Sequence, residues 1–173
     1  ALALLFGEYV REIHINDLSP PIYAFWVAAR DHTERFCRRI DEVPLTVEEW
    51  RRQREILASP GQHSCFDLGF AAFFVNRTSR SGILSSSGVI GGLEQKGRWK
   101  IDARFSRSGL SERIRKIGRF RDRIRVSGLD AAEFLLEIVP TLRQKGLLYL
   151  DPPYFDKGDR LYEKYYGVDG TGW

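Results

Sequence analysis

The stretch Leu147–Tyr154 places the strongest constraint on the fold, because an apolar run leads directly into Asp-Pro-Pro-Tyr. Residues 147–150 have strand-forming character, and the two prolines cannot continue a hydrogen-bonded ladder. We therefore expect a buried strand whose carboxyl end is followed by Asp151 and Tyr154, where open α/β sheets bind ligands. A carboxylate, unpaired carbonyl oxygens and an aromatic ring could hold a planar base and its exocyclic amine. A surface Asp in a Pro-Pro turn fits the tetrapeptide equally well.

Length and composition indicate a soluble globular protein. The 173 residues are 43% hydrophobic and 29% charged, which suffices for one domain with a real core. No apolar run approaches the roughly 20 residues that cross a membrane. Cys37 and Cys65 have neither metal-ligand nor disulfide-scaffold spacing, so we expect reduced thiols, no metal and a cytoplasmic location.

Positive charge is concentrated in one part of the chain. Residues 96–125 contain twelve Lys or Arg and three acidic residues, a net charge of +9, whereas the rest of the chain carries −5. A basic block between acidic segments predicts a polyanion partner on one face. A solvated basic helix is the alternative.

The first part of the chain predicts a strand followed by a helix. Residues 12–17 alternate between apolar and polar, as in a short strand. Ser19 is a plausible N-cap, and prolines are acceptable in the first turn of the helix that follows. Asp17 would lie at the strand-to-helix turn, where nucleotide-binding folds place an acidic residue that accepts hydrogen bonds from ribose hydroxyls. A simple turn Asp is the alternative.

The middle of the chain predicts helices and then a loop. Residues 31–57 are helical in pattern, with a capping box at Thr46 and Glu49, and residues 69–75 are apolar enough for a core helix. A Ser- and Gly-rich loop follows. Alternation over residues 99–105 predicts a half-exposed strand.

The last part alternates between helix and strand. Leu110, Ile114, Ile117 and Phe120 mark an amphipathic helix with a basic opposite face. Residues 123–126 predict a strand, and Phe134 begins the apolar face of another helix. Such alternation implies a mostly parallel sheet with helices on both faces.

Taken in order, these features resemble the Dam-like, D12-class adenine-specific DNA methyltransferases. The similarity extends over nearly the whole chain. The similarity rests on short motifs that occur in the same order as in the family. They are Asn16-Asp17, residues 74–83, Gly91-Gly92 with Gln95 and Gly97, Ala103-Arg104-Phe105, the Asp-Pro-Pro-Tyr motif, Lys157-Gly158, Leu161-Tyr162 and Tyr165.

The resemblance implies a cofactor, S-adenosylmethionine, and a catalytic site. Asp17 resembles the acidic residue that holds the cofactor ribose, and Asp151 resembles the motif carboxylate, which lies beside the cofactor and accepts a hydrogen bond from the adenine N6 amine. The Pro152 carbonyl resembles the second acceptor, followed by Pro153, and the Tyr154 ring stacks on the extruded base. Two acceptors aim the amine lone pair at the sulfonium methyl for in-line transfer.

The interval between Asp17 and Asp151 resembles the target-recognition region of the family. The candidates for contact with double-stranded DNA are Arg77, Arg80, Ser81 and Arg104. An Arg there can read guanine or hold phosphate, and a purely structural Arg77 is the alternative. Some relatives have an aromatic wedge at the position of Arg80, which this chain lacks.

The expected fold is therefore α/β, an incomplete Rossmann-like methyltransferase fold with an inserted, mostly helical target-recognition region. Residues 1–30 and 121–173 would form the core, and residues 31–120 would contact DNA. Family motifs that grip the methionine end of the cofactor, Phe-x-Gly-Gly and Asp/Glu-Pro-Phe-x-Gly-x-Gly, have no counterpart. We therefore expect a fragment cut at both ends, which on its own could be inactive.

Two other functions fit the same residues. An amino-methyltransferase could act on cytosine N4, or on an RNA or protein amide. A non-catalytic remnant could bind DNA through its basic block alone, with strongly salt-dependent affinity and no affinity for the cofactor. A bacterial or phage enzyme of this class would act at the nucleoid, and a cognate restriction endonuclease is a potential partner.

Overall fold

The computed structural model describes residues 1–84, 87–142 and 146–151. The helices and strands are, in chain order, α1 (Leu2–Phe6), β1 (Ile13–Asn16), α2 (Pro20–Asp31), α3 (Thr33–Glu42), α4 (Val47–Ala58), α5 (Cys65–Thr78), α6 (Arg107–Arg119), β2 (Ile124–Ser127) and α7 (Ala131–Ile138). Short 3-10 turns occur at Pro60–Gln62, Arg121–Arg123 and Val139–Thr141.

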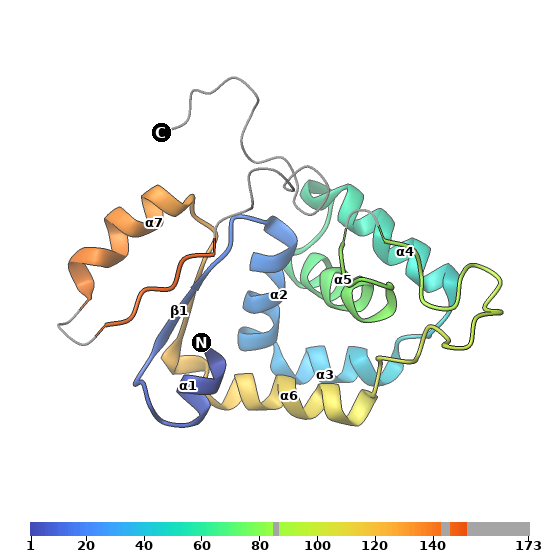
Figure 1. The fold of residues 1–173 in the computed structure, drawn as a ribbon, viewed down its shortest axis with the longest axis horizontal. Helices are drawn as coiled ribbons and strands as arrows, with labels where there is room; N and C mark the ends of the chain where they lie inside the picture. Colours follow the sequence, from blue (N-terminus) through green and yellow to red (C-terminus); the bar gives the residue numbers. More distant parts are fainter. Residues whose placement is uncertain (85–86, 143–145, 152–173) are drawn as a thin grey trace, which may run out of the picture.

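The fold is α/β, with two parallel strands and a larger body of helices (Figure 1). β1 and β2 pair in register from Ile13 with Ile124 to Asn16 with Ser127. The chain between them forms α2 to α6. Figure 1 shows the strand pair between α7 on one side and α2 on the other. The expected strands at residues 12–17 and 123–126 are thus confirmed, and their carboxyl ends lie side by side.

α5 is the centre of the helical body and is buried nearly all round. Phe70, Phe74 and Val75 are each at most 1% exposed. At Gly69, a β-carbon would lie only 2.4 Å from the Ala24 carbonyl oxygen, so a glycine lets α5 and α2 approach this closely. The core helix expected at residues 69–75 is confirmed and extends to Cys65–Thr78.

Local helix signals were also correct. The Thr46 hydroxyl accepts a hydrogen bond from the Glu49 N–H (3.1 Å) at the start of α4. α6 buries Leu110, Ile114 and Ile117 and exposes the basic residues of its opposite face, Arg113, Arg115, Lys116 and Arg119. Since helix caps and amphipathic faces depend on neighbours in sequence, they can be read without knowledge of the fold.

The buried strand expected at residues 147–150 is wrong for the described structure. The segment is extended but pairs with neither strand, and its side chains are exposed, with Leu147 at 78% and Tyr149 at 79%. Strand formation requires a neighbouring strand for the backbone and a cover for the side chains. β1 pairs with β2, and among the described residues nothing pairs with the run after α7.

The strand expected at residues 99–105 is also wrong. This segment forms consecutive turns, in which the Ala103 N–H donates to the Lys100 carbonyl (3.0 Å) and the Phe105 N–H to the Asp102 carbonyl (2.8 Å). Ile101 and Phe105 are buried and Ala103 is exposed. The two buried residues, Ile101 and Phe105, are four positions apart, a spacing that suits turns. The alternation in the sequence included Ala103, which is exposed to solvent in the structure.

Candidate functional site

A network of side-chain hydrogen bonds joins the carboxyl ends of β1 and β2. The Asn16 side-chain oxygen accepts hydrogen bonds from the Ser127 hydroxyl (2.7 Å) and the Leu129 N–H (3.0 Å), and the Asn16 amide donates to the Leu129 carbonyl (2.9 Å). The Ser127 hydroxyl also lies 3.1 Å from His14 Nε2. The network therefore fixes the turn after β2 beside Asp17, the residue that follows β1.

Asp17 lies half-buried at this carboxyl end. Its backbone N–H donates to the Ser127 carbonyl (3.1 Å), and its Oδ1 accepts a hydrogen bond from the Ser19 N–H (2.9 Å). Ser19 occupies the expected N-cap position of α2, but its hydroxyl makes no capping hydrogen bond. Asp17 Oδ2 has no hydrogen-bond partner among the described residues, so it can accept hydrogen bonds from a ligand that approaches the end of the strands.

Burial raises the pKa of the Asp17 carboxyl, and the hydrogen bond from the Ser19 N–H partly offsets that rise. The folded state thus holds this proton more tightly than the unfolded chain does. The stabilisation is present below the unfolded-state pKa and is lost as pH rises through the folded-state pKa. At neutral pH the ionised Asp17 therefore costs stability, which is typical of a carboxylate placed for binding.

Asp17→Asn tests this cost. Asn retains an oxygen for the Ser19 N–H and cannot ionise, so we expect the free energy of unfolding at neutral pH to equal or exceed that of the parent. The difference should shrink as pH falls toward about 4, where the unfolded carboxyl protonates. Urea unfolding of the parent and the variant at several pH values measures the stability difference at neutral pH and its change with pH. A variant less stable than the parent at neutral pH would instead identify Asp17 as a structural turn residue.

Tyr23 and Gly128 flank Asp17 and had no assigned role in the sequence analysis. A β-carbon on Gly128 would lie 3.2 Å from two atoms of the Tyr23 ring and 3.6 Å from the Asp17 carbonyl oxygen. The ring of Tyr23, on the first turn of α2, thus packs close to the backbone of the turn after β2. A Ser-Gly pair directly after a strand is the only sequence signal for this contact.

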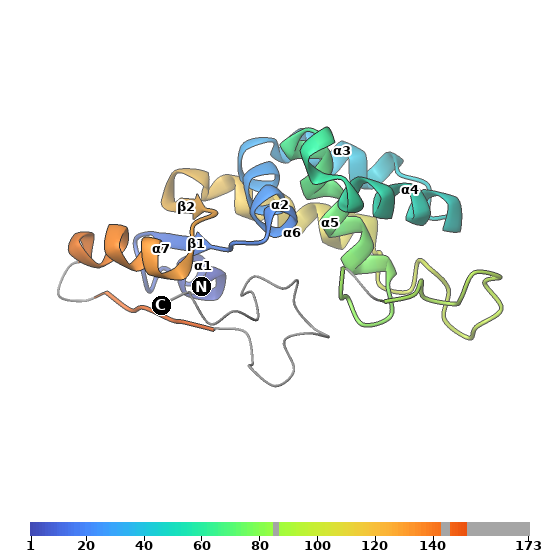
Figure 2. The same ribbon diagram turned by 90° about the horizontal axis from the view of Figure 1, so that it is seen from above.

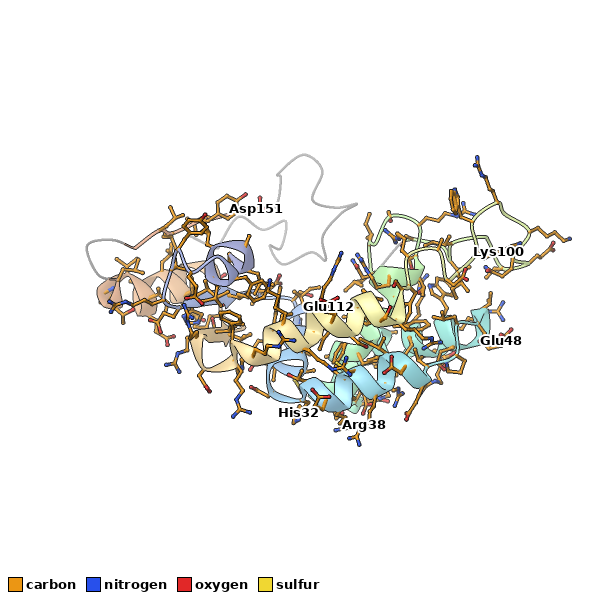
Figure 3. All side chains as sticks on the ribbon, turned by 90° about the horizontal axis from the view of Figure 1, so that it is seen from below. His32, Arg38, Glu48, Lys100, Glu112 and Asp151 are labelled. Atoms are coloured by element: carbon orange, nitrogen blue, oxygen red, sulfur yellow. The ribbon has the colours of Figure 1, made fainter. Side chains whose placement is uncertain are left out.

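Asp151 lies at the end of the extended run and is exposed. It forms no hydrogen bond or ion pair with any part of the chain that the structure describes, and no such contact joins it to Asp17. Pro152, Pro153 and Tyr154 lie outside the described residues. Figure 3 shows Asp151 on the edge of the molecule opposite His32 and Arg38.

Three arginines gather near the end of α5: Arg77, Arg104 and Arg113, here called the arginine cluster. Arg77 is half-buried, and its guanidinium donates two hydrogen bonds to Asn76 Oδ1 (3.1 and 2.9 Å). Burial and the positive charges of Arg104 and Arg113 lower the pKa of Arg77. None of the three takes part in an ion pair between described residues. Such a group of like charges favours an anionic ligand.

The other residues predicted to contact DNA are Arg104, which belongs to this cluster, and Arg80 and Ser81, which follow α5. Arg104 also has a structural role, since its guanidinium donates to the Asn76 carbonyl (3.0 Å) and to the Ser79 carbonyl at the end of α5. Arg80 and Ser81 are exposed on the turn that follows. The structure thus brings Arg77 and Arg104 together and adds Arg113, which the sequence marked only as part of the basic face of α6.

Two open cavities lie elsewhere. One, of about 480 Å³, is lined by residues at the start of α3 and the end of α6, including Arg30, His32, Arg115 and Arg119. The other, of about 580 Å³, is lined by residues of α4 and its surroundings, including Arg39, Arg52, Glu55 and His63. Neither of these two cavities is lined by Asp17, Asp151 or the arginine cluster.

The part of the chain that the structure describes contains no group of three His, Cys, Asp or Glu side chains that could hold a metal ion. Within the same residues, no helix combines the length and the apolar character needed to span a membrane. Comparison of the chain with protein-family models, with curated proteins and with solved structures gave no match.

Proposed function

We propose that this protein transfers a methyl group from S-adenosylmethionine to the N6 amine of adenine in duplex DNA. The observation that carries the proposal is Asp17, a half-buried carboxylate at the carboxyl end of a parallel strand, with its Oδ2 unpaired among the described residues. Its pKa is raised by burial, so the ionised group costs stability at neutral pH. Ligand binding is a physical reason to retain such a group.

The residues around Asp17 fit the nucleoside part of the cofactor. One carboxylate oxygen is held by the Ser19 N–H (2.9 Å), and the other would accept hydrogen bonds from the ribose hydroxyls of the cofactor. The Tyr23 ring packs against Gly128, close to the Asp17 backbone carbonyl, and offers an apolar surface at the same end of the strands. When bound, S-adenosylmethionine would supply an activated methyl group on a positively charged sulfur.

Asp151 is proposed to accept a hydrogen bond from the adenine amine, with the Pro152 carbonyl as second acceptor and Tyr154 stacked on the base. Pro152 and Tyr154 lie outside the described residues, so this part rests on the sequence motif. A base must leave the duplex to reach such acceptors, at a cost of a few kcal/mol that stacking partly offsets.

The arginine cluster supports a polyanionic substrate. Arg77, Arg104 and Arg113 lie close enough for the charges of the other two to lower the pKa of Arg77, and the described structure gives none of them a carboxylate partner. Phosphates of a duplex would relieve this repulsion and release counterions. DNA is therefore favoured over an uncharged amine substrate.

Arg77→Ala is expected to weaken duplex binding several-fold and to reduce the slope of log K against log salt by about one. Arg38→Ala is the control, because Arg38 is an exposed arginine of α3 that does not belong to the arginine cluster and lies on the edge opposite Asp151 (Figure 3). Fluorescence anisotropy over a salt series measures both variants. Equal losses in the two variants, or none in Arg77→Ala, would assign Arg77 a structural role through Asn76. A loss confined to one base position would identify base readout rather than phosphate contact.

The function itself is tested by cofactor binding and product analysis. Calorimetry measures the affinity for S-adenosylmethionine of residues 1–173, and of the longer protein where the natural chain continues. Incubation of duplex DNA with labelled cofactor, followed by nucleoside analysis, separates N6-methyladenine from N4-methylcytosine. If residues 1–173 and the longer protein both bind DNA but neither binds S-adenosylmethionine, the better interpretation is a non-catalytic DNA-binding remnant.

A further inference from the structure

The cavity of about 480 Å³ between the start of α3 and the end of α6, here called the α3–α6 cavity, has no part in the proposed function. Figures 1 and 2 show α3 beside α6, and the two helices pack together. The volume falls within the range of pockets that hold small molecules, roughly 300–1,000 Å³. His32 lines the cavity, and Figure 3 shows it on the edge of the molecule opposite Asp151. The cavity therefore lies away from the methyltransferase motif.

A close contact between the two helices gives the cavity a fixed shape. Thr33 of α3 and Gly118 of α6 both line it. A β-carbon on Gly118 would lie only 2.4 Å from Thr33 Oγ1, so a glycine lets the helices approach this closely. The Thr33 hydroxyl donates to the Ala29 carbonyl (2.8 Å), which holds its side chain in place. The cationic groups that α3 and α6 carry are thus set at fixed positions around the cavity.

Arg30 adds a rigid positive group at the end of α2. Two of its guanidinium nitrogens donate to the two carboxylate oxygens of Asp31 (both 2.7 Å), and the third donates to the Ile124 carbonyl (3.1 Å). These hydrogen bonds lower the pKa of Asp31, burial opposes the effect, and the positive charges of His32 and Arg121 lower the pKa further. The one carboxylate that is held in the cavity is therefore already occupied by Arg30.

Positive charge exceeds negative charge around the cavity. Five arginines and two carboxylates line it, a net charge of +3 with His32 counted as neutral. The second carboxylate, Glu34, approaches Arg115 only to 3.7 Å, and both side chains are exposed. Arg35 and Arg119 form no ion pair with a described residue. Such a surplus of positive charge around a concave space favours an anionic ligand.

The start of α3 contributes further donors. The Arg35 guanidinium lies 3.8 Å from the centre of the Phe66 ring, and Phe66 is buried. A guanidinium that rests on a ring face keeps its N–H donors for an anion. The first turn of α3 also lines the cavity, and no side chain caps it, so its backbone N–H groups add to the positive potential.

We propose that the α3–α6 cavity binds a small anion with two adjacent phosphate groups, held by Arg35, Arg119 and Arg121. Guanidinium groups match phosphate oxygens with paired hydrogen bonds, and two phosphates carry enough negative charge to offset the surplus in the lining. A duplex fits less well, because the space is of small-molecule size and contains two carboxylates. Free pyrophosphate and the phosphate tail of a nucleotide both supply the required group. The inference does not depend on the proposed function.

The test is calorimetric titration of the whole chain with pyrophosphate in magnesium-free buffer at constant ionic strength. We expect Arg119→Ala to weaken binding about ten- to a hundredfold, the range for loss of a hydrogen bond to a charged group. Arg119→Lys should lose less, because the charge remains. Arg38→Ala is the matched control and should bind as the parent does, since Arg38 is an exposed arginine of α3 that does not line the cavity. Thermal unfolding without ligand should be the same in all variants, because both arginines are exposed.

Further ligands identify the source of the phosphates. Pyrophosphate should bind more tightly than inorganic phosphate or sulfate. Equal affinities for ATP and pyrophosphate would indicate recognition of the phosphates alone, whereas tighter binding of ATP would identify a nucleotide as the ligand.

Three results would overturn the inference: no pyrophosphate binding by the parent, an equal loss in Arg119→Ala and Arg38→Ala, or equal affinities for sulfate and pyrophosphate. Displacement of pyrophosphate by duplex DNA, with the same sensitivity to Arg119→Ala, would also overturn it by making the cavity part of a DNA-binding surface. S-adenosylmethionine contains no phosphate and should not compete. Failure of the proposed function and failure of this inference are therefore distinguishable.

Discussion

Phe36→Ala is expected to lower the free energy of unfolding by about 3–5 kcal/mol, the range for removal of a buried aromatic side chain. Phe36, on α3, is 0% exposed. Its ring centroid lies 5.2–6.0 Å from those of four other rings, Phe25, Phe66, Phe70 and Phe73. Residues of α2, α3 and α5 thus share one aromatic cluster, and a cavity at Phe36 removes contacts with two neighbouring helices at once.

Two controls separate this cavity from a general effect of substitution. Phe36→Leu retains most of the volume and should cost clearly less than Phe36→Ala. Leu136→Ala, at a residue of α7 that is 79% exposed, should change stability by no more than about 0.5 kcal/mol. Urea unfolding followed by circular dichroism measures all three variants. A loss below about 1 kcal/mol in Phe36→Ala would show that the ring cluster is not packed in solution.

Elements with local signals were predictable from the sequence. The helix cap at Thr46, the amphipathic face of α6 and the strand before Asp17 each depend on residues a few positions apart. The position of Asp17 at the end of a parallel strand followed from the same local pattern. The burial of Asp17 and its unpaired Oδ2 could not be predicted from that pattern, because the surroundings of Asp17 include β2, which is more than a hundred residues away in sequence.

Features that depend on distant contacts could not be predicted. Residues 147–150 have the composition of a strand, but strand formation also requires a paired neighbour, which no local pattern reveals. The turn around Trp99 is determined by hydrogen bonds of the Gln95 side chain to backbone groups and by two glycines that touch across the turn. Arg77, Arg104 and Arg113 are separated in sequence and become one cluster only through the packing of the helical body, in which α5 contacts α2 and α4 while α6 contacts α3 and α2.

Asp151→Ala is expected to reduce methyl transfer by at least about two to three orders of magnitude, the cost of removing one pre-positioned hydrogen-bonding group from a transition state. Duplex binding should remain near the parental value, because the arginine cluster lies on other elements. The free energy of unfolding should change by no more than about 0.5 kcal/mol, since Asp151 is exposed and forms no hydrogen bond or ion pair with the described residues. Asp151→Asn keeps the size and one acceptor oxygen, so its residual activity measures how much of the effect depends on the negative charge.

Asp122→Ala is the matched control for Asp151→Ala. Asp122 is exposed and, among the described residues, forms only a long ion pair with Arg121 (3.6 Å), so its loss removes the same charge from the surface without touching the motif. Methyl transfer is measured with labelled cofactor at saturating DNA, and duplex binding by anisotropy on the same preparations. Equal activity of the Asp151 and Asp122 variants would remove Asp151 from the chemistry. A parallel loss of DNA binding and activity in Asp151→Ala would place the carboxylate in substrate binding instead. Only a loss of transfer with intact binding and stability supports hydrogen bonding of Asp151 to the reacting amine.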